Sequence, residues 1–352
     1  MRIPRTTRVE PQIALQLILF FSFLGDKSIL SILLAPFFDK VSLIRCPIIK
    51  LAHYYYYVNS SLSKELRYHF LMSHENLDKK IQGKEIAGEI VQRLKSQKKP
   101  EKFLAAFLVG DDPASLSFLK KKEEVAQELG VEFRFYQIPL TKESNEIRGE
   151  IERVQGEDDC GGVLVQLPLA KHFEVREILN AIDPKKDVDV LGEAARGAFY
   201  NGDSLVLPPA ISVVQEICGR RTITLEKARV VVVGIGFLIG KPIATWLMGR
   251  VKELSVLTRK SDLLDPLCGL QNADLIITGA GSPGVVHSHM LKEGAGVIDF
   301  GTSLVEGKLK GDLHIEVSEI SKLAFYTPTP GGTGPVLVAK LFENFYIMNH
   351  EA

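Results

Sequence analysis

The chain has 352 residues, enough for two domains of ordinary size, and its 45% hydrophobic and 24% charged content is typical of a soluble globular protein. Lysine plus arginine and aspartate plus glutamate both number 43, so the net charge gives no reason to expect nucleic acid as a partner. The cysteines, Cys46, Cys160, Cys218 and Cys268, show no C-x-x-C or Cys/His spacing. This pattern argues against a metal site and a disulfide framework and favours a reducing, cytoplasmic location.

Residues 1–71 differ from the rest of the chain, and we treat them as an N-terminal extension of open status. A basic start precedes two apolar runs, 13–24 and 29–38, and each is shorter than the roughly 20 residues that span a bilayer. A membrane-spanning protein is therefore not expected. Three interpretations stay open: sequence translated ahead of a true start at Met72, a targeting or membrane-associating segment, and a structured extension.

From residue 77 onward the pattern becomes regular and predicts an α/β fold. Apolar runs that end at glycine or proline alternate with segments of helical periodicity, which is typical of mostly parallel sheets covered by helices. We predict two α/β domains: a β-α-β catalytic domain, 77–209, completed by a C-terminal helix, 331–350, and a Rossmann-like domain, 210–330. The predicted strands are 103–110, 131–140, 160–169, 228–236, 254–258, 273–281 and 294–301, and the predicted helices are 83–97, 113–129, 145–154, 211–220 and 334–350.

The helix predicted over 113–129 has clear start and stop signals. Asp112 is suited to cap its first turn, a proline follows, and Gly130 suits the C-terminal cap. Ser115, Phe118 and Lys122 then fall on one helical face. A plain alternative for Phe118 is packing in the core. The lysines at 120 and 121 are expected to face solvent.

A glycine-rich loop, "VVVVGIGFLIGKP", follows a strand of four valines. The absent side chains at Gly234 and Gly236 would let backbone amides approach a pyrophosphate at the start of the next helix. The G-x-G-x-x-x-G spacing is one residue longer than the usual dinucleotide pattern. A tight turn that merely permits close packing is the alternative.

The second strand of this predicted unit ends beside Arg259, where a domain that binds NAD normally carries a carboxylate for the ribose hydroxyls. A carboxylate would repel the 2′-phosphate of NADP, whereas a guanidinium can form two parallel hydrogen bonds with it. The sequence therefore favours NADP, although a solvated loop charge is the simpler alternative.

Several motifs together resemble one family. "VGDDPAS" with a lysine seven residues after its serine, "GGVLVQLPL", "PKKDVDV", "VVVGIGFLIGKP" and "YTPTPGGTGP" are similar in order and spacing to the bifunctional methylenetetrahydrofolate dehydrogenase/methenyltetrahydrofolate cyclohydrolase family. The resemblance covers about residues 81–347. It implies an NADP-dependent oxidation of 5,10-methylenetetrahydrofolate, hydrolysis of the methenyl product to 10-formyltetrahydrofolate, a tetrahydrofolate cleft between two domains, and a homodimer.

The resemblance also implies roles for individual residues. Lys122 matches the catalytic lysine, Gln166 its close partner, and Asp189 the residue that holds the pterin ring. The remaining matches are to substrate-binding positions, Ser115, Phe118, Pro330, Gly331 and Gly332, and to cofactor-binding positions, Gly234, Ile235, Gly236 and Thr302.

Some positions depart from the family pattern. Phe118 stands where the family has tyrosine, so a hydroxyl near the lysine is missing. Val190 replaces a glycine that is suited to special backbone angles. Segment 208–211 lacks a threonine and a glycine of the family, and Gly236 and Phe237 replace a serine and its polar neighbour. These departures leave a rival open: a weakened relative that binds folate or NADP, or an interaction partner, without full activity.

Overall fold

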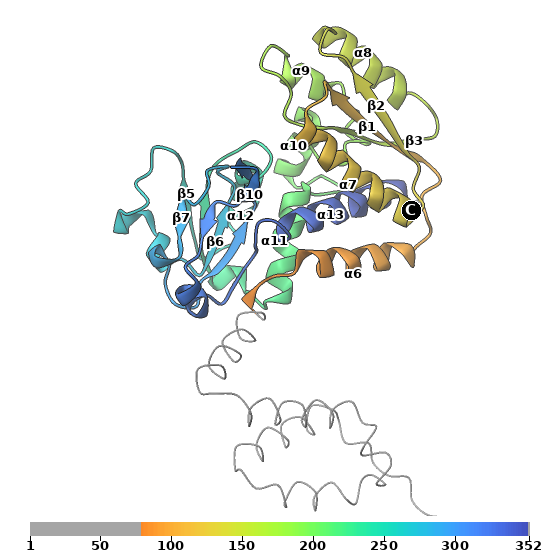
Figure 1. Cartoon of the computed structure of the whole chain (residues 1–352). Coiled ribbons are helices and arrows are strands. Elements are labelled where there is room, and N and C mark those ends of the chain that lie inside the picture. Colours follow the sequence, from red (N-terminus) through yellow and green to blue (C-terminus); the bar gives the residue numbers. More distant parts are fainter. Residues whose placement is uncertain (1–78, 351–352) are drawn as a thin grey trace, which may run out of the picture. The chain divides into compact units, whose positions relative to one another are not determined.

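The computed structural model describes residues 79–350, drawn in colour in Figure 1. The expectations for residues 1–71 lie outside the described residues. Two parallel sheets organise the described part of the chain. The first holds three strands in the order β2-β1-β3, and the second holds five strands in the order β12-β8-β6-β4-β5.

The three-stranded sheet consists of β1 (Phe103–Val109), β2 (Phe133–Ile138) and β3 (Cys160–Val165). Every residue of β1 is buried, because alternate side chains enter different cores. Leu104 and Leu108 pack in the core with helices α6 (Gly83–Lys95) and α7 (Pro113–Leu129). Phe103 and Phe107 pack in the opposite core with α8 (Ser144–Gln155) and α9 (Val175–Asn180). Helices therefore cover both faces, as the run of apolar residues predicted.

Helix α13 (Thr333–Asn349) returns from the five-stranded sheet to the three-stranded sheet, where it contacts α6, α7, β3 and α11 (Pro209–Arg220) (Figure 1). Its Phe342, Phe345 and Tyr346 are almost fully buried. At its buried face, Lys340 forms ion pairs with Glu216 and Glu343, at 2.9 and 2.8 Å. The C-terminal helix therefore packs beside the three-stranded sheet.

The five-stranded sheet consists of β4 (Arg229–Val233), β5 (Glu253–Leu257), β6 (Leu275–Thr278), β8 (Gly296–Asp299) and β12 (Phe325–Tyr326), all parallel. The chain places β5 on one side of β4 and β6 on the other. In doubly wound sheets such a reversal of strand order marks the ligand-binding edge. The glycine loop leaves β4 at this point and enters α12 (Gly240–Leu247).

Most predicted strands and helices are present, and the differences concern short elements. Sequence periodicity did not predict α9 or α10 (Glu193–Asn201), nor the paired strands β7 (Val286–His287) with β11 (Leu313–His314) and β9 (Ser303–Val305) with β10 (Lys308–Lys310). Helix α11 contacts both α12 and α13, so the boundary between residues 209 and 210 stays a prediction. Within residues 79–350, no helix has the length and apolar character that a membrane crossing requires.

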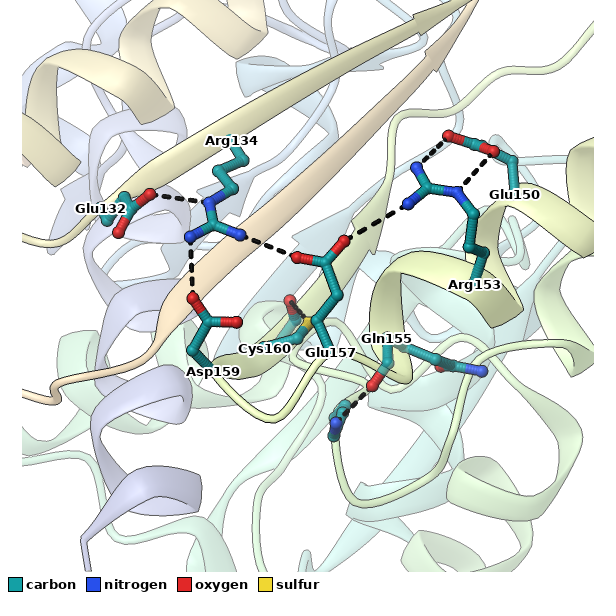
Figure 2. A network of polar contacts seen from close by, with 10 residues as sticks. Glu132, Arg134, Glu150, Arg153, Gln155, Glu157, Asp159 and Cys160 are labelled. Carbon is teal, nitrogen blue, oxygen red and sulfur yellow. Dashed lines mark hydrogen bonds and ion pairs between the residues drawn. The ribbon is translucent and has the colours of Figure 1, made fainter.

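A polar network marks the amino-terminal edge of the three-stranded sheet (Figure 2). Arg134, near the start of β2, forms ion pairs with Glu132, Glu157 and Asp159 at 2.7 to 2.9 Å. Its guanidinium carbon also lies 3.5 Å from the centre of the Phe103 ring. The network ties the loop before β3 to β2. It lies at the opposite edge of the sheet from the ends of β1 and β3, where the motif residues begin.

Candidate active site

The carboxyl-terminal edge of the three-stranded sheet carries the first group of motif residues. Lys122 Nζ donates a hydrogen bond to Gln166 Oε1 at 3.1 Å. The other end of this amide is also held, because Gln166 Nε2 donates to the Leu167 carbonyl at 2.8 Å. The backbone amide of Gln166 donates to the Phe107 carbonyl of β1. Sheet pairing therefore fixes the glutamine, and the glutamine presents only its oxygen to the lysine.

Asp189 lies close enough to Lys122 to influence its charge. Burial lowers the pKa of the Lys122 ammonium, and the negative charge of Asp189 opposes this shift without cancelling it. Burial likewise raises the pKa of Asp189, and the charge of Lys122 opposes that shift. We infer that a larger share of Lys122 is neutral near pH 7 than of an exposed lysine. A neutral amine has a lone pair that can accept a proton.

The turn that carries Asp189 is organised by Asp187, which sequence reasoning did not assign a role. The buried Asp187 carboxylate accepts hydrogen bonds from the backbone amides of Leu191 and Gly192, at 2.8 and 2.7 Å. Burial raises its pKa to about 6. Val190, inside the same turn, adopts a φ of 56°. The repeated aspartate of "DVDV" was the available signal for Asp187.

The amino-terminal turns of α7 hold the predicted substrate residues. Asp112 accepts a hydrogen bond from the backbone amide of Ser115 at 2.8 Å, and Gly130 ends the helix with a φ of 68°, so both predicted caps are confirmed. Ser115 is buried, whereas the Phe118 side chain is 37% exposed. That exposure argues against core packing for Phe118. Lys121 is exposed as expected, and its ammonium lies 5.3 Å from the centre of the Phe118 ring.

The loop of Pro330, Gly331 and Gly332 lies where the five-stranded sheet leads into α13. The Gly331 carbonyl accepts a hydrogen bond from the Gly83 amide at the start of α6. Thr333, the first residue of α13, donates its hydroxyl proton to the Asp299 carbonyl at the end of β8. The loop therefore connects the amino end of α6 with the carboxyl edge of the five-stranded sheet. Within residues 79–350, the Lys122 ammonium donates its hydrogen bond to Gln166 and not to this loop.

The glycine loop is tightly packed against the loop that follows β6. Gly234 has a φ of 89°, and a Cβ atom there would lie 2.6 Å from Ala280 Cα. A Cβ on Gly240 would lie 1.8 Å from the Gly234 carbonyl oxygen. At Gly236 the nearest atom would be 3.5 Å away, so this position has room for a side chain. Close packing thus requires Gly234 and Gly240, while the stretch from Ile235 to Leu238 is exposed.

Arg259 lies in an exposed turn after β5, and Thr302 is an exposed residue between β8 and β9, at the same edge of the five-stranded sheet. The Gly234 amide donates to the Leu257 carbonyl at the end of β5, so the turn with Arg259 begins beside the glycine loop. Within residues 79–350, the Arg259 side chain forms no hydrogen bond or ion pair. Thr302 donates to the Phe300 carbonyl at 3.3 Å.

A pocket of about 150 Å³ joins Asp189 to the residues after the glycine loop. It is lined by residues 189–191, by Arg196, Phe199 and Tyr200 of α10, by Pro208, and by Phe237, Leu238, Lys241, Pro242 and Thr245. Sequence reasoning assigned no role to Arg196 or Lys241, because no motif in the sequence marked either one as a ligand-binding cation. Within residues 79–350, no group of three or more histidine, cysteine and acidic residues could hold a metal ion.

Comparisons with known proteins agree with this arrangement. The family described as "Tetrahydrofolate dehydrogenase/cyclohydrolase, catalytic domain" matches residues 76–189, and its NAD(P)-binding domain matches residues 208–352. The bifunctional protein FolD of Halothermothrix orenii is 34% identical over 278 residues, which cover 76% of this chain and 96% of that protein. The FolD of Staphylococcus aureus strain Newman is 33% identical over 272 residues, with coverage of 75% and 94%.

Solved structures give the same result. The FolD methylenetetrahydrofolate dehydrogenase/cyclohydrolase of Campylobacter jejuni superposes with a TM-score of 0.72 and is 34% identical, covering 77% of this chain and 98% of that chain. The Trypanosoma brucei enzyme, solved with NADP and an inhibitor, has a TM-score of 0.70 and is 28% identical, with coverage of 76% and 96%. From both domain matches and these relatives, the chain belongs to the tetrahydrofolate dehydrogenase/cyclohydrolase family.

Proposed function

We propose that the chain oxidises 5,10-methylenetetrahydrofolate to 5,10-methenyltetrahydrofolate with NADP and hydrolyses the product to 10-formyltetrahydrofolate. Family membership supports both reactions and the cofactor. The observation that carries the assignment of residues is the hydrogen bond between Lys122 and Gln166, formed close to Asp189 at a pocket that reaches the glycine loop. NADP, when bound, accepts the hydride of the oxidation step.

The hydrolytic step follows from the charges around Lys122. The methenyl group is a cation, so a neutral amine beside it avoids the repulsion that an ammonium would meet. The amine accepts a proton from the attacking water, and the oxygen adds to the methenyl carbon. The bond between this carbon and N5 then breaks, N5 takes the proton back from Lys122, and the hydroxyl loses its proton to solvent as the formyl group forms on N10. Gln166 orients the amine through an uncharged contact. Asp189 is suited to accept hydrogen bonds from the donor-rich edge of the pterin.

Loss of methenyltetrahydrofolate absorbance tests the assignment of Lys122. In the full chain, Lys122→Met should reduce hydrolysis by about 100-fold or more, which is typical of removing a general base. Lys120→Met, on the exposed side of the same helix, is the matched control and should hydrolyse at the wild-type rate. Equal rates for Lys122→Met and wild type would remove Lys122 from the mechanism.

The second candidate is a relative that binds folate or NADP with weakened hydrolysis. It is favoured by Phe118, which presents a phenyl ring without a hydroxyl on the face that carries Lys122. Calorimetric binding of methenyltetrahydrofolate without lysine-dependent turnover would support this candidate over the active enzyme.

We also propose a homodimer and a cytoplasmic location. The dimer is supported by β2, an edge strand of the three-stranded sheet, whose Phe135 side chain is 44% exposed. An edge strand offers unpaired backbone groups to a second copy. Light scattering of the full chain should give twice the 39.0 kDa mass of one chain, and a monomer mass would reject the dimer.

A further inference from the structure

The pocket beside the glycine loop contains a guanidinium that forms no hydrogen bond or ion pair within residues 79–350, although its charge acts on the nearby Glu193 carboxylate. Arg196 extends from α10, and its Nε atom is buried with no hydrogen-bond partner within residues 79–350. The side chain also forms no ion pair there, although Asp189 lines the same pocket. A buried polar atom left without a partner is unfavourable, and more so when it is charged. An arginine in this state fits an anion that is supplied by a ligand.

The guanidinium of Arg196 lies over the Phe237 ring. The Arg196 Cζ atom lies 4.5 Å from the centre of the ring. Stacking uses the face of the guanidinium and leaves its in-plane N–H groups free for two parallel hydrogen bonds with phosphate oxygens. Because Phe237 belongs to the loop between β4 and α12, the stack places a cation from α10 over that loop.

The charges around the pocket favour an anion. Lys241, in the first turn of α12, lines the same pocket and forms no ion pair within the described residues. The pocket therefore contains two cations and one carboxylate, and Asp189 already interacts with Lys122. The loop between residues 234 and 239, "GIGFLI", offers backbone amides but no hydroxyl and no charge of its own.

We infer that Arg196, which extends from α10, binds the pyrophosphate of the dinucleotide cofactor beside the glycine loop. This inference rests on the proposed function, because it assumes that a dinucleotide binds there. The topology distinguishes the pyrophosphate from the 2′-phosphate. In a doubly wound sheet the pyrophosphate lies at the loop after the first strand, here β4, and the adenosine ribose lies at the end of the second strand, here β5. Arg196 stacks over the first of these loops, and Arg259 lies at the second.

Equilibrium binding of NADPH and NADH to the full chain, measured by calorimetry, tests this inference without any turnover. Arg196→Met keeps the aliphatic stem and removes the charge. Its Kd should rise by about 10- to 100-fold, as expected for the loss of a charge-assisted hydrogen bond. The factor should be the same for both cofactors, because both contain the pyrophosphate. Arg196→Lys keeps the charge without the planar fork and should show an intermediate loss.

Arg250→Met is the matched control. Arg250 also lies over an aromatic ring, with its Cζ atom 5.7 Å from the Trp246 ring centre, and it donates to the Trp246 carbonyl. Arg250 does not line the pocket, so Arg250→Met should bind NADPH and NADH with the wild-type Kd values. Should Arg196→Met not fold, as judged by its melting curve, Arg196→Lys carries the same test.

Two results would overturn the assignment of Arg196. Wild-type affinity of Arg196→Met for both cofactors would show that the guanidinium contacts neither. A loss confined to NADPH would place the contact at the 2′-phosphate instead of the pyrophosphate. Failure of the wild-type chain to bind either cofactor is a different outcome, since it would reject the proposed function and this inference with it.

Discussion

Val190 gives a quantitative test of how the turn beside Asp189 is held. Its φ of 56° lies in the left-handed region, although the side chain is β-branched and only 3% exposed. This conformation costs a residue other than glycine about 1 to 2 kcal/mol. The side chain packs in a small core with Ala195 and Val206, so mutation to glycine would change packing and backbone strain together. Comparing alanine with glycine at the same position separates the two effects.

The expected difference can be calculated from these terms. At an ordinary buried position, Ala→Gly loses one buried carbon, about 0.8 kcal/mol, and adds freedom to the unfolded chain, about 0.5 to 1 kcal/mol. The total is about 1.5 kcal/mol. At Val190 the relief of about 1 to 2 kcal/mol of backbone strain offsets this loss. The two variants, Val190→Ala and Val190→Gly, should therefore have nearly equal free energies of unfolding.

Val206 supplies the matched control in the same small core. Among the described residues other than glycine, those with a positive φ are Val190, Thr222 and Glu306. Val206 is not among them, although it packs in the same small core. Urea unfolding of the four variants should show that Ala→Gly is less costly at 190 than at 206 by about 1 to 2 kcal/mol. An equal penalty at both positions would refute the argument that Val190 is strained.

Four further predictions concern single side chains. Phe118→Tyr should raise the rate of methenyltetrahydrofolate hydrolysis by about tenfold, because one added hydrogen bond contributes about 1.4 kcal/mol. An unchanged rate would show that the missing hydroxyl does not limit hydrolysis. Arg259→Ala should reduce the preference for NADP over NAD in steady-state assays, and an unaltered ratio would remove Arg259 from cofactor selection. The pKa of Asp187 is about 6 in the folded protein, raised from 3.8, so the native state keeps the carboxyl proton to a higher pH than the unfolded chain does. The protonated carboxyl therefore adds to the free energy of unfolding. This contribution is complete only below the unfolded pKa, near 3.8, and is lost as the pH rises through about 6. The stability of wild type relative to Asp187→Asn should therefore increase by about 2 kcal/mol from pH 7 to pH 4 in urea unfolding, at about 1.4 kcal/mol per unit, and a pH-independent difference would contradict the raised pKa. Gly234→Ala should destabilise the protein by at least about 2 kcal/mol through backbone strain and the contact with Ala280, whereas Gly149→Ala, inside α8 with open space around it, should stabilise it by about 0.5 to 1 kcal/mol.

The sequence predicted those parts of the fold that local chemistry determines. The buried strands β1, β3, β4 and β6 are continuous apolar runs, and the ends of α7 have a cap at Asp112 and a left-handed glycine at Gly130. At Val190, the glycine of the family pattern indicated either special backbone angles or close packing, and the valine has a φ of 56°. Short elements such as α9 and β7 were missed, since two to six residues carry little periodicity.

Contacts between distant residues were beyond prediction from periodicity. Arg196 and Phe237 are 41 residues apart and come from different elements, so neither neighbourhood contains a sign of the other. The proximity of Asp189 to Lys122 depended on the resemblance, because one lies in a turn and the other on a helix. The assignments of Ser115, Thr302 and the loop 330–332 remain predictions, which ligand binding can test.

The course of α13 has a consequence for synthesis on the ribosome. This helix supplies Phe342, Phe345 and Tyr346 to the core of the three-stranded sheet, yet it is translated after the entire five-stranded sheet. Domains usually fold in the order in which they emerge. Here the amino-terminal sheet cannot complete its core until residue 349 has left the exit tunnel, so the later sheet can mature first. Nascent chains stopped before residue 333 should expose the apolar faces of α6 and α11 and require a chaperone to stay soluble.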